Sequence, residues 1–384
     1  MRVLYIMNNV DQGGAALAFK DMIDEVLDNH PEITPIILLA KNNTLASYFE
    51  KKGVEIHVIN FNNFLTTERH PKILWKVVLL SRYLLAKRNF FKTVENRLKI
   101  ASIDLIHSNL DRFDIGAQLA KKYTLPHVWH IREHGDDFNL QNLLLTDAIK
   151  HMNSFHSHFI AISQSVLNKW KEYGIENITL VYDGINATTY PGNLQKSAKV
   201  RILFLGGITK TKGQDRFFKI IATLPPETLA KIQIDFIGNG PSHYIQFLKM
   251  KYRQLSDVFM FYPYKNDILK QVGQYDIGVN ASFMEGFGRV TAEYLEQGLF
   301  VMGSASGASP EIITDDKLGW LIDFSDAPQA NALKLKEIID TEVYKLDRAY
   351  RIEYIRENFS IKKHVNNVLT VYKQVSENNY DQSI

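Results

Sequence analysis

Short apolar runs rich in β-branched residues alternate along the chain with stretches in which apolar residues recur at helical spacing. Such runs predict strands buried on both faces, and the stretches between them predict crossover helices. In the first half the predicted strands are VLYIM, PIILLA, VEIHVI, IDLIHS, HVWHI and FIAIS. In the second half they are VRILFLGG, IQIDFIG, VFMFYPY, YDIGVN, LFVMGSAS and GWLIDF. This alternation predicts an α/β fold with two doubly wound, Rossmann-like domains.

The polar stretch NATTYPGNLQKSAK separates the two series of predicted strands and places a domain boundary near residues 187–198. We therefore expect an N-terminal domain over residues 1–190 and a C-terminal domain over residues 198–359. The remaining residues, 360–384, show helical spacing after Ser360, a suitable N-cap. The apolar positions of this last helix are Ile361, Val365, Val368, Leu369, Tyr372 and Val375.

Composition excludes several classes of protein. The 384 residues include no cysteine, so disulfide frameworks and thiolate metal sites are excluded, and a reducing, cytoplasmic location is expected. The start, MRVLYIMNNV, is typical of a buried first strand rather than a signal peptide, and no segment reaches transmembrane length. A net charge of +3 is too small to indicate nucleic acid as a partner.

One segment departs from this balanced charge. Residues 70–99 contain eight lysines and arginines and one acid, a net charge of +7, interleaved with aromatic and aliphatic residues. This mixture predicts a basic amphipathic helix in peripheral contact with an anionic membrane, with Trp75 and Phe90 adding apolar contact. Three alternatives stay open: a helix that packs on the core and exposes a solvated basic face, an acidic protein partner, or an anionic soluble glycan.

Glycine-bearing loops follow several predicted strands, where the ligands of open α/β sheets bind. The first is DQGGAALAF, in which Gly13 and Gly14 precede a helix and are candidates for binding the phosphate or sugar of the donor through backbone N–H groups. The second half has GGITKTKG, IGNGP and EGFG, and its candidate donor-site residues include Gly206, Gly207, Lys210, Lys212 and Asn239. Lys212 is a compact cation suited to a diphosphate. The repetition of glycine-bearing loops at the ends of strands predicts a nucleoside diphosphate ligand held by the second domain and a partner held by the first.

The stretch EGFGRVTAE carries an acid at each end, Glu285 and Glu293. If all of it were helical, these acids would lie roughly 80° apart and two turns away from each other, a poor geometry for one site. Gly286 and Gly288 instead predict a loop followed by a helix from about Arg289. Glu285 would then lie before a helix N-terminus, where anions such as phosphate bind. The alternative is an ordinary capped surface helix.

These residues resemble the GT-B fold glycosyltransferases of the large retaining family 4. The resemblance spans nearly the whole chain, and its most specific part is the E-x7-E motif within NASFMEGFGRVTAEYLEQGLFVMGSASGASPEII. Supporting matches are the early GGA loop, AISQSVLNKW through VYDGIN, and FLGGITKTKG. The resemblance implies that Glu285 binds hydroxyls of the donor sugar and that Glu293 binds the ribose. The backbone implied to hold the donor's sugar and phosphate is that of Gly286, Phe287, Gly288, Arg289 and Val290. The last helix is implied to cross back to the N-terminal domain.

The reaction that this resemblance implies transfers a sugar from a nucleoside diphosphate sugar to an acceptor hydroxyl with retention of anomeric configuration. No D-x-D sequence occurs in the chain. This absence fits a GT-B enzyme, so we expect no metal and no other cofactor, with positive groups stabilising the diphosphate. The resemblance implies that Glu285 and Lys212 are catalytic residues. The expected acceptor is a glycan or a lipid-linked molecule in polysaccharide or glycoconjugate synthesis at the cytoplasmic face of a membrane.

Two departures from the family pattern stand out. Gly207 occupies the position where family members usually carry an arginine. Lys210 lies close enough in sequence to substitute for it, but a lysine does not reproduce a bidentate guanidinium, so either donor binding is weaker or another group supplies the charge. In HVWHIREHGDDF, Arg132 and Glu133 align with the family's His-Asp pair on the acceptor side. The flanking His130 and His134 are further candidates for acceptor contact, and His130 and Arg132 for catalysis. For each histidine a purely packed role stays open.

Two other functions remain compatible with the sequence. A GT-B epimerase would act on the nucleotide sugar itself, without a separate acceptor, and the basic segment and the E-x7-E motif count against it. A catalytically silent, glycosyltransferase-like binding subunit would explain why Gly207 stands where the family usually carries an arginine.

Overall fold

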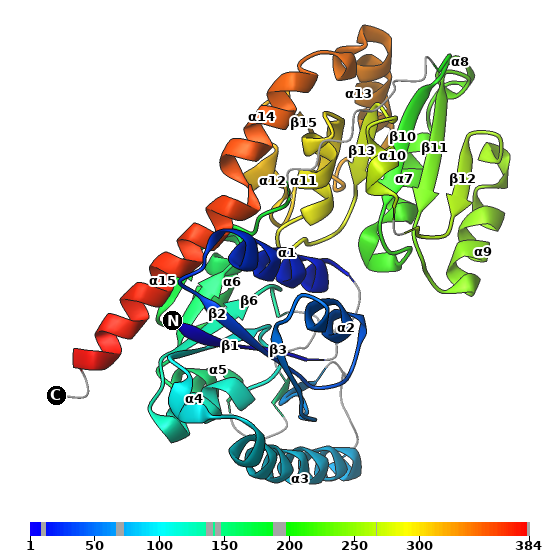
Figure 1. Cartoon of the computed structure of the whole chain (residues 1–384). Helices are drawn as coiled ribbons and strands as arrows, with labels where there is room; N and C mark the ends of the chain where they lie inside the picture. The colour runs from blue at the N-terminus through cyan, green and yellow to red at the C-terminus, as the bar shows by residue number, and fades with distance from the viewer. Residues whose placement is uncertain are drawn as a thin grey trace. The chain divides into compact units, whose positions relative to one another are not determined.

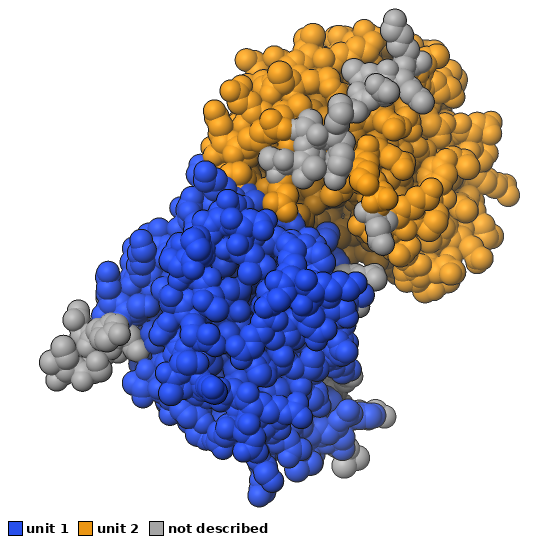
Figure 2. Space-filling model, viewed as in Figure 1, with its two compact units in different colours: residues 1–184, 361–384 blue, residues 185–360 orange. Residues whose placement is uncertain are grey.

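The computed structural model describes residues 1–8, 13–66, 73–135, 141–142, 147–186, 197–265 and 267–381. The chain forms two compact units (Figures 1 and 2). Unit 1 comprises Met1–Gly184 and Ile361–Ile384, and unit 2 comprises Ile185–Ser360. The chain thus passes between units at Gly184 and again at Ser360. Most of the predicted linker at 187–198 lies outside the described residues.

Unit 1 contains a parallel sheet of seven strands in the order β3-β2-β1-β5-β6-β8-β9. The strands are β1 (Arg2–Met7), β2 (Thr34–Leu39), β3 (Glu55–Val58), β5 (Leu105–Asn109), β6 (His127–Ile131), β8 (His158–Ala161) and β9 (Ile178–Leu180). Two residue pairs, β4 (Leu65–Thr66) and β7 (Gln141–Asn142), add a small antiparallel ladder. The helices are α1 (Gly14–Asn29), α2 (Thr44–Glu50), α3 (Ile73–Arg97), α4 (Ile115–Tyr123), α5 (Ala148–Asn153), α6 (Gln164–Tyr173) and α15 (Ile361–Asp381), with a 3-10 turn at Ile100–Ser102.

Each face of this sheet has its own apolar core, because successive side chains of a strand point to opposite faces. On one face Tyr5 and Met7 pack with α1, α2 and α15. On the other face Leu4 and Ile6 pack with α3 and α4. Burial on both faces explains why the strands are nearly continuous apolar runs.

Unit 2 contains a parallel sheet of six strands in the order β12-β11-β10-β13-β14-β15. The strands are β10 (Val200–Leu205), β11 (Ile232–Ile237), β12 (Phe259–Tyr262), β13 (Ile277–Asn280), β14 (Phe300–Ser304) and β15 (Gly319–Ile322). The helices are α7 (Gln214–Ile221), α8 (Pro226–Leu229), α9 (Ser242–Lys251), α10 (Leu269–Val272), α11 (Arg289–Glu296), α12 (Ser309–Ile312), α13 (Pro328–Thr341) and α14 (Arg348–Asn358). Three 3-10 turns lie at Lys210–Lys212, Arg253–Leu255 and Val343–Lys345.

Both strand orders reverse direction once, between β1 and β5 in unit 1 and between β10 and β13 in unit 2. At such a switch point the loops after the two strands diverge and leave room for a ligand at their carboxyl ends. The predicted doubly wound fold is confirmed, and it positions one candidate ligand edge in each unit.

The last helix, α15, belongs to unit 1, as predicted. Val365, Val368 and Tyr372 are buried in the same core as α1, and the two helices lie side by side in Figure 1. The Tyr372 hydroxyl lies 2.6 Å from Nδ1 of the buried His107 on β5. The chain therefore leaves unit 1, forms unit 2 and returns.

The basic segment forms α3, and part of this helix is core. Phe90 is fully buried and its ring packs 5.9 Å from that of Phe61. The Tyr83 hydroxyl, also buried, donates to Asp114 at 2.8 Å. The expectation that Phe90 contacts a membrane is therefore wrong, because the apolar core of unit 1 already covers it. The exposed apolar residues of α3 are Trp75, Val77, Val78, Leu84 and Leu85.

Within the described parts of the chain, none of the helices combines the length and the apolarity needed to cross a bilayer.

Candidate active site

Loops after three strands of unit 2 approach one another so closely that only glycine fits at several positions. A Cβ on Gly213 would lie 2.0 Å from the carbonyl oxygen of Ala281, and the φ angle of Gly213 is +79°. A Cβ on Gly238 would lie 1.8 Å from the carbonyl oxygen of Gly206, whose own φ is +133°. These glycines bring the loops after β10, β11 and β13 together at the switch point.

Lys212 and Glu285, predicted separately as diphosphate and sugar ligands, meet at this point. Lys212 Nζ lies 2.6 Å from Glu285 Oε1. The Ser282 hydroxyl donates to the same carboxylate oxygen at 2.5 Å. The Glu285 side chain is 17% exposed and that of Lys212 is 40% exposed, so both remain accessible from solvent. A cation, a carboxylate and a hydroxyl therefore share one partly buried edge.

The backbone of the Glu285 loop is held from a neighbouring loop. Ala308 donates its N–H to the Glu285 carbonyl at 3.0 Å, and the Ser306 hydroxyl donates to the Phe283 carbonyl at 2.6 Å. A Cβ on Gly307 would lie 2.6 Å from the Glu285 nitrogen. The position of the carboxylate thus depends on the loop after β14 as well as on its own.

The predicted change from loop to helix within EGFGRVTAE is confirmed. Gly288 has a φ of +87° and α11 begins at Arg289. Among the described residues, no side chain caps the start of α11. Backbone N–H groups at such a start, with the positive end of the helix dipole, suit an anion. Phe287 is buried and anchors the loop by packing 5.7 Å from the Phe359 ring, and Val290 is half-buried.

Glu293 lies on α11 and pairs with Arg289 at 2.8 Å. Burial, then the charge of Glu293, raises the pKa of the Tyr264 phenol. The Tyr264 N–H donates to Asn239 Oδ1 at 3.2 Å. Asn239 and Tyr264, which follow β11 and β12, are therefore in contact at the carboxyl edge of this sheet.

Ser282 and Tyr264 were missed at the sequence level. Tyr264 ends the predicted strand VFMFYPY, and Ser282 lies two residues after the predicted strand YDIGVN. A position close to the end of a strand was the one signal that the sequence held for them.

Gly207 and Lys210 lie exposed in the loop after β10. A Cβ on Gly207 would have only the Asn239 carbonyl oxygen within 4 Å, at 3.9 Å. The Gln214 side chain donates to the Gly207 carbonyl at 2.9 Å. This loop therefore has space for a larger side chain at residue 207.

In unit 1, Gly13 and Gly14 stand at the start of α1, directly after the undescribed residues 9–12. Gly13 has a φ of +103°, and a Cβ on either glycine would meet nothing within 4 Å among the described residues. Both glycines are exposed. The part that these glycines play in donor binding stays a prediction.

The candidate acceptor residues cluster at the carboxyl ends of β5 and β6. Arg132 is 5% exposed and donates from Nε to Asn109 Oδ1 at 2.7 Å and from Nη1 to Asp183 Oδ2 at 2.8 Å. His130 is fully buried, with its ring stacked 5.5 Å from that of His364. Burial, then the charge of Arg132, lowers the pKa of His130 well below its usual value, so this histidine is neutral.

Glu133 and His134 contact side chains other than Asn109 and Asp183, the two partners of Arg132. Glu133 accepts from Arg112 at 2.7 Å, and His134 Nε2 lies 2.8 Å from the Ser165 hydroxyl. Their predicted contacts with an acceptor are not tested by these interactions and stay predictions.

Asp111, in the loop after β5, was not among the predicted site residues. It is fully buried, and neither of its carboxylate oxygens has a hydrogen-bond partner among the described residues. Burial, then the charge of Glu133, raises the pKa of Asp111 to about 7, while Arg112 opposes this shift. Leu110 before it has a φ of 126°, a strained value for leucine.

We expect Asp111 to reduce stability as the pH rises. The folded chain binds the proton of the Asp111 carboxyl more tightly than the unfolded chain does. The stabilisation that this proton gives to the fold is therefore complete below pH about 4 and is lost as the pH passes 7. Asparagine cannot ionise, so Asp111→Asn removes this dependence on pH. The free energy of unfolding of the variant minus that of the unaltered chain should therefore be larger at pH 8 than at pH 4 by a few kcal/mol. Urea unfolding of both proteins at the two pH values measures this, and a pH-independent difference would contradict it.

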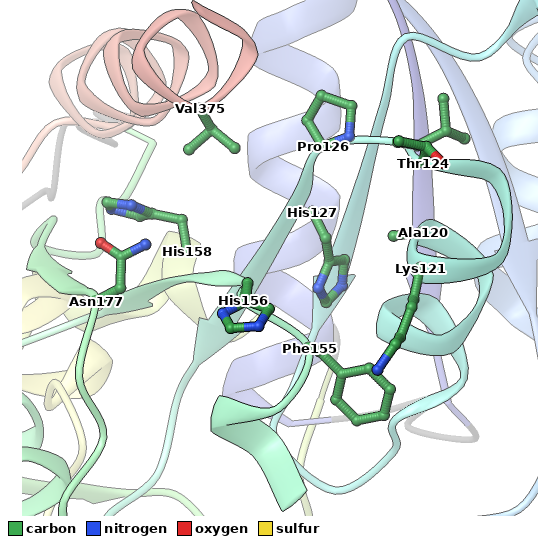
Figure 3. Close-up of a pocket in the computed structure, with 11 residues that line it drawn as sticks. Ala120, Lys121, Thr124, Pro126, His127, Phe155, His156, His158, Asn177 and Val375 are labelled. Atoms are coloured by element: carbon green, nitrogen blue, oxygen red, sulfur yellow. The ribbon is translucent and has the colours of Figure 1, made fainter. Parts of the chain in front are cut away.

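A cavity of about 270 Å³ lies at the opposite edge of the unit 1 sheet. Figure 3 shows it between Lys121, His127, His156 and His158, with Val375 of α15 at its side. His127 and His158 are the first residues of β6 and β8, so the cavity lies at the amino ends of these strands. It is therefore separate from the carboxyl edge where Arg132 lies.

Comparisons with known proteins agree with this architecture. The family model "Glycosyl transferases group 1" matches residues 188–358, and the model "Glycosyltransferase Family 4" matches residues 43–189. The N-acetyl-alpha-D-glucosaminyl L-malate synthase of Bacillus anthracis is 23% identical over 363 residues, covering 86% of this chain and 92% of that protein.

Solved structures show the same fold. Anabaena Alr3699/HepE, solved in complex with UDP, has a TM-score of 0.78 at 18% identity and covers 97% of this chain and 100% of its own. The glycosyltransferase of Rickettsia africae has a TM-score of 0.72 at 18% identity, covering 97% of this chain and 98% of its own. The fold is GT-B, and the chain belongs to the glycosyltransferases of group 1 and family 4.

Proposed function

We propose that this glycosyltransferase is retaining, uses a nucleoside diphosphate sugar as donor and acts without a metal ion. The observation that carries the proposal is the Lys212–Glu285 pair, at 2.6 Å, on the carboxyl edge of the unit 2 sheet beside the start of α11. Support also comes from Alr3699/HepE, which has been solved with UDP and with UDP-glucose. A glycan or lipid-linked acceptor in polysaccharide or glycoconjugate synthesis completes the proposal.

The proposed reaction assigns a separate task to each group. Lys212 and the N–H groups at the start of α11 stabilise the departing diphosphate as the bond from the anomeric carbon to its oxygen breaks. Glu285 binds donor sugar hydroxyls while the sugar becomes cationic. The acceptor oxygen bonds to the anomeric carbon on the face that the diphosphate leaves, and its proton passes to a diphosphate oxygen. The anomeric configuration is thereby retained, and the protein acts by positioning and charge stabilisation.

The test of this function is incubation of the purified chain with a panel of UDP-, GDP- and ADP-sugars. Release of the nucleoside diphosphate with transfer or hydrolysis of the sugar supports the proposal. Isomerisation of the nucleotide sugar would instead show an epimerase, and failure to bind any nucleotide would show a silent binding subunit.

We expect Lys212→Ala to weaken donor binding and to slow transfer together, because the same cation contacts the diphosphate before and during its departure. A charge-assisted contact of this kind corresponds to roughly 2 kcal/mol, or about thirtyfold in affinity. Calorimetric titration with UDP measures the change. The control is Lys219→Ala, on the outer side of α7, and equal UDP affinity in all three proteins would contradict this role.

Removal of divalent ions should leave turnover unchanged. Positive side chains and a helix start carry the charge stabilisation in this proposal, so no ion is required. The measurement is sugar release after dialysis against EDTA, with and without added Mg²⁺ or Mn²⁺. A loss of activity that either ion restores would contradict metal independence.

We also propose that α3 attaches the chain to an anionic membrane at its cytoplasmic face. Trp75, Val77 and Leu85 are each more than half exposed, and basic residues flank them. Each cation near such a surface adds about 1 kcal/mol, enough for reversible attachment when several act together. The buried Phe90 takes no part.

Co-sedimentation with anionic and neutral vesicles at low and high salt tests this attachment. Changing Lys76, Arg82, Lys87 and Arg88 to glutamine should abolish binding to anionic vesicles. The matched control changes four exposed lysines of unit 2 to glutamine: Lys199, Lys249, Lys265 and Lys317. Equal sedimentation of both variants, or no binding by the unaltered chain at low salt, would exclude this role.

A further inference from the structure

Two buried side chains at the carboxyl ends of β5 and β6 form a polar site in unit 1. Asn109 is the last residue of β5 and is fully buried, and Arg132 directly follows β6 and is 5% exposed. Arg132 is held at two nitrogens, by Asn109 at 2.7 Å and by Asp183 at 2.8 Å. Because a guanidinium is planar and rigid, these two bonds also fix the direction of its third nitrogen.

The third nitrogen of Arg132 is Nη2. Arg132 Nη2 and Asn109 Nδ2 are both buried, and neither has a hydrogen-bond partner among the described residues. A buried charged donor without a partner is costly, because it has lost its hydrogen bonds to water and gained none in return. Nearly all such groups in folded proteins are satisfied, so two together indicate a site completed by a bound molecule.

The chemistry of these donors favours an acid. Both groups donate, and the guanidinium keeps its charge at every relevant pH. Arginine binds carboxylate and phosphate oxygens with short, charge-assisted bonds, which are about twice as strong as bonds to neutral oxygens. The nearby histidines do not compete as cations, because burial and then the charge of Arg132 lower the pKa of both His107 and His130.

The location connects this site with the reaction. It lies at the carboxyl edge of the unit 1 sheet, one strand from the switch point between β1 and β5. Resting on the proposed function, we infer that the sugar acceptor carries an acidic group, a carboxylate or a phosphate, which Arg132 Nη2 and Asn109 Nδ2 bind.

Asn109→Asp separates this role from a purely structural one. The new carboxylate still accepts from Arg132 Nε and forms a charged pair with it, so the fold is retained. The same change removes the Nδ2 donor and places a negative charge where an acid would bind. A second variant, Arg132→Gln combined with Asp183→Asn, removes the buried cation and its partner together, so that no charge is left unpaired.

The experiment is a calorimetric titration of the full chain, saturated with UDP, at constant ionic strength. The probes are inorganic phosphate, malonate and D-glucuronate, with methyl glucoside as the neutral comparison. We expect at least one acid to bind at least ten times more tightly than methyl glucoside. Both variants should lose this preference by at least tenfold while keeping their affinity for UDP. Preference for phosphate or for the carboxylates distinguishes the two kinds of acceptor.

Two outcomes overturn the inference: no acid binds more tightly than methyl glucoside, or Asn109→Asp binds acids as the unaltered chain does. Failure of UDP to bind counts against the proposed function instead. In that case the acids are titrated without UDP into the Lys212→Ala variant, in which Lys212 can no longer bind them. This titration still decides whether Arg132 and Asn109 bind an acid.

Discussion

Glu285→Gln is expected to lower the rate of sugar transfer about a thousandfold, equivalent to roughly 4 kcal/mol of transition-state stabilisation. The carboxylate lies 2.6 Å from Lys212 and 2.5 Å from the Ser282 hydroxyl. Glutamine can accept from both groups, so the loop keeps its structure. The negative charge is lost, and that charge is needed most when the sugar becomes cationic.

Initial rates of donor consumption, with circular dichroism of both proteins, measure this effect. The matched control is Glu337→Gln, an exposed carboxylate of α13 that pairs with Lys334. Turnover within a factor of three of the unaltered chain in Glu285→Gln would remove this residue from the mechanism. An equal loss in Glu337→Gln would show a general effect of charge on unit 2.

Gly213→Ala is expected to destabilise unit 2 by roughly 3–5 kcal/mol, a fall in its thermal midpoint of about 10 °C. The added Cβ would lie 2.0 Å from the Ala281 carbonyl oxygen, at a backbone φ of +79° that alanine adopts poorly. Relief of this overlap must move the loop after β10 away from β13. Lys212, the preceding residue, moves with it, so UDP affinity should fall as well.

Gly207→Ala is the matched control in the same loop. The nearest atom to its added Cβ is 3.9 Å away, an ordinary contact, and no positive φ opposes alanine there. Its thermal midpoint and UDP affinity should stay close to those of the unaltered chain. If both variants behave alike in differential scanning calorimetry, the close approach of these loops does not determine the site.

The sequence predicted the sheets because most of their strands are buried on both faces. HVWHI corresponds to β6 residue for residue, and all five positions are buried. By contrast β9, with three half-buried residues, lacks a long apolar run and was missed. Phe90 was misplaced because apolar residues lie on more than one side of α3, and only the packing of unit 1 shows which side is core.

Site residues from the E-x7-E stretch could be predicted because loop, helix start and carboxylates lie within nine residues of sequence. The environment of Arg132 could not. Its partner Asp183 lies 51 residues further along the chain, and their contact at 2.8 Å depends on the order of the strands. For Ser282 the sequence shows a position close to the end of a predicted strand, but not the contact with Glu285 at 2.5 Å.

The most direct measurement of the central claim is a crystal structure of the full chain with the nucleoside diphosphate that it binds most tightly. We predict that the diphosphate oxygens lie within hydrogen-bond distance of Lys212 Nζ and of the N–H groups at the start of α11. The ribose should lie beside Glu293. A diphosphate bound elsewhere, with the Lys212–Glu285 pair unchanged and no ligand beside it, would contradict the account.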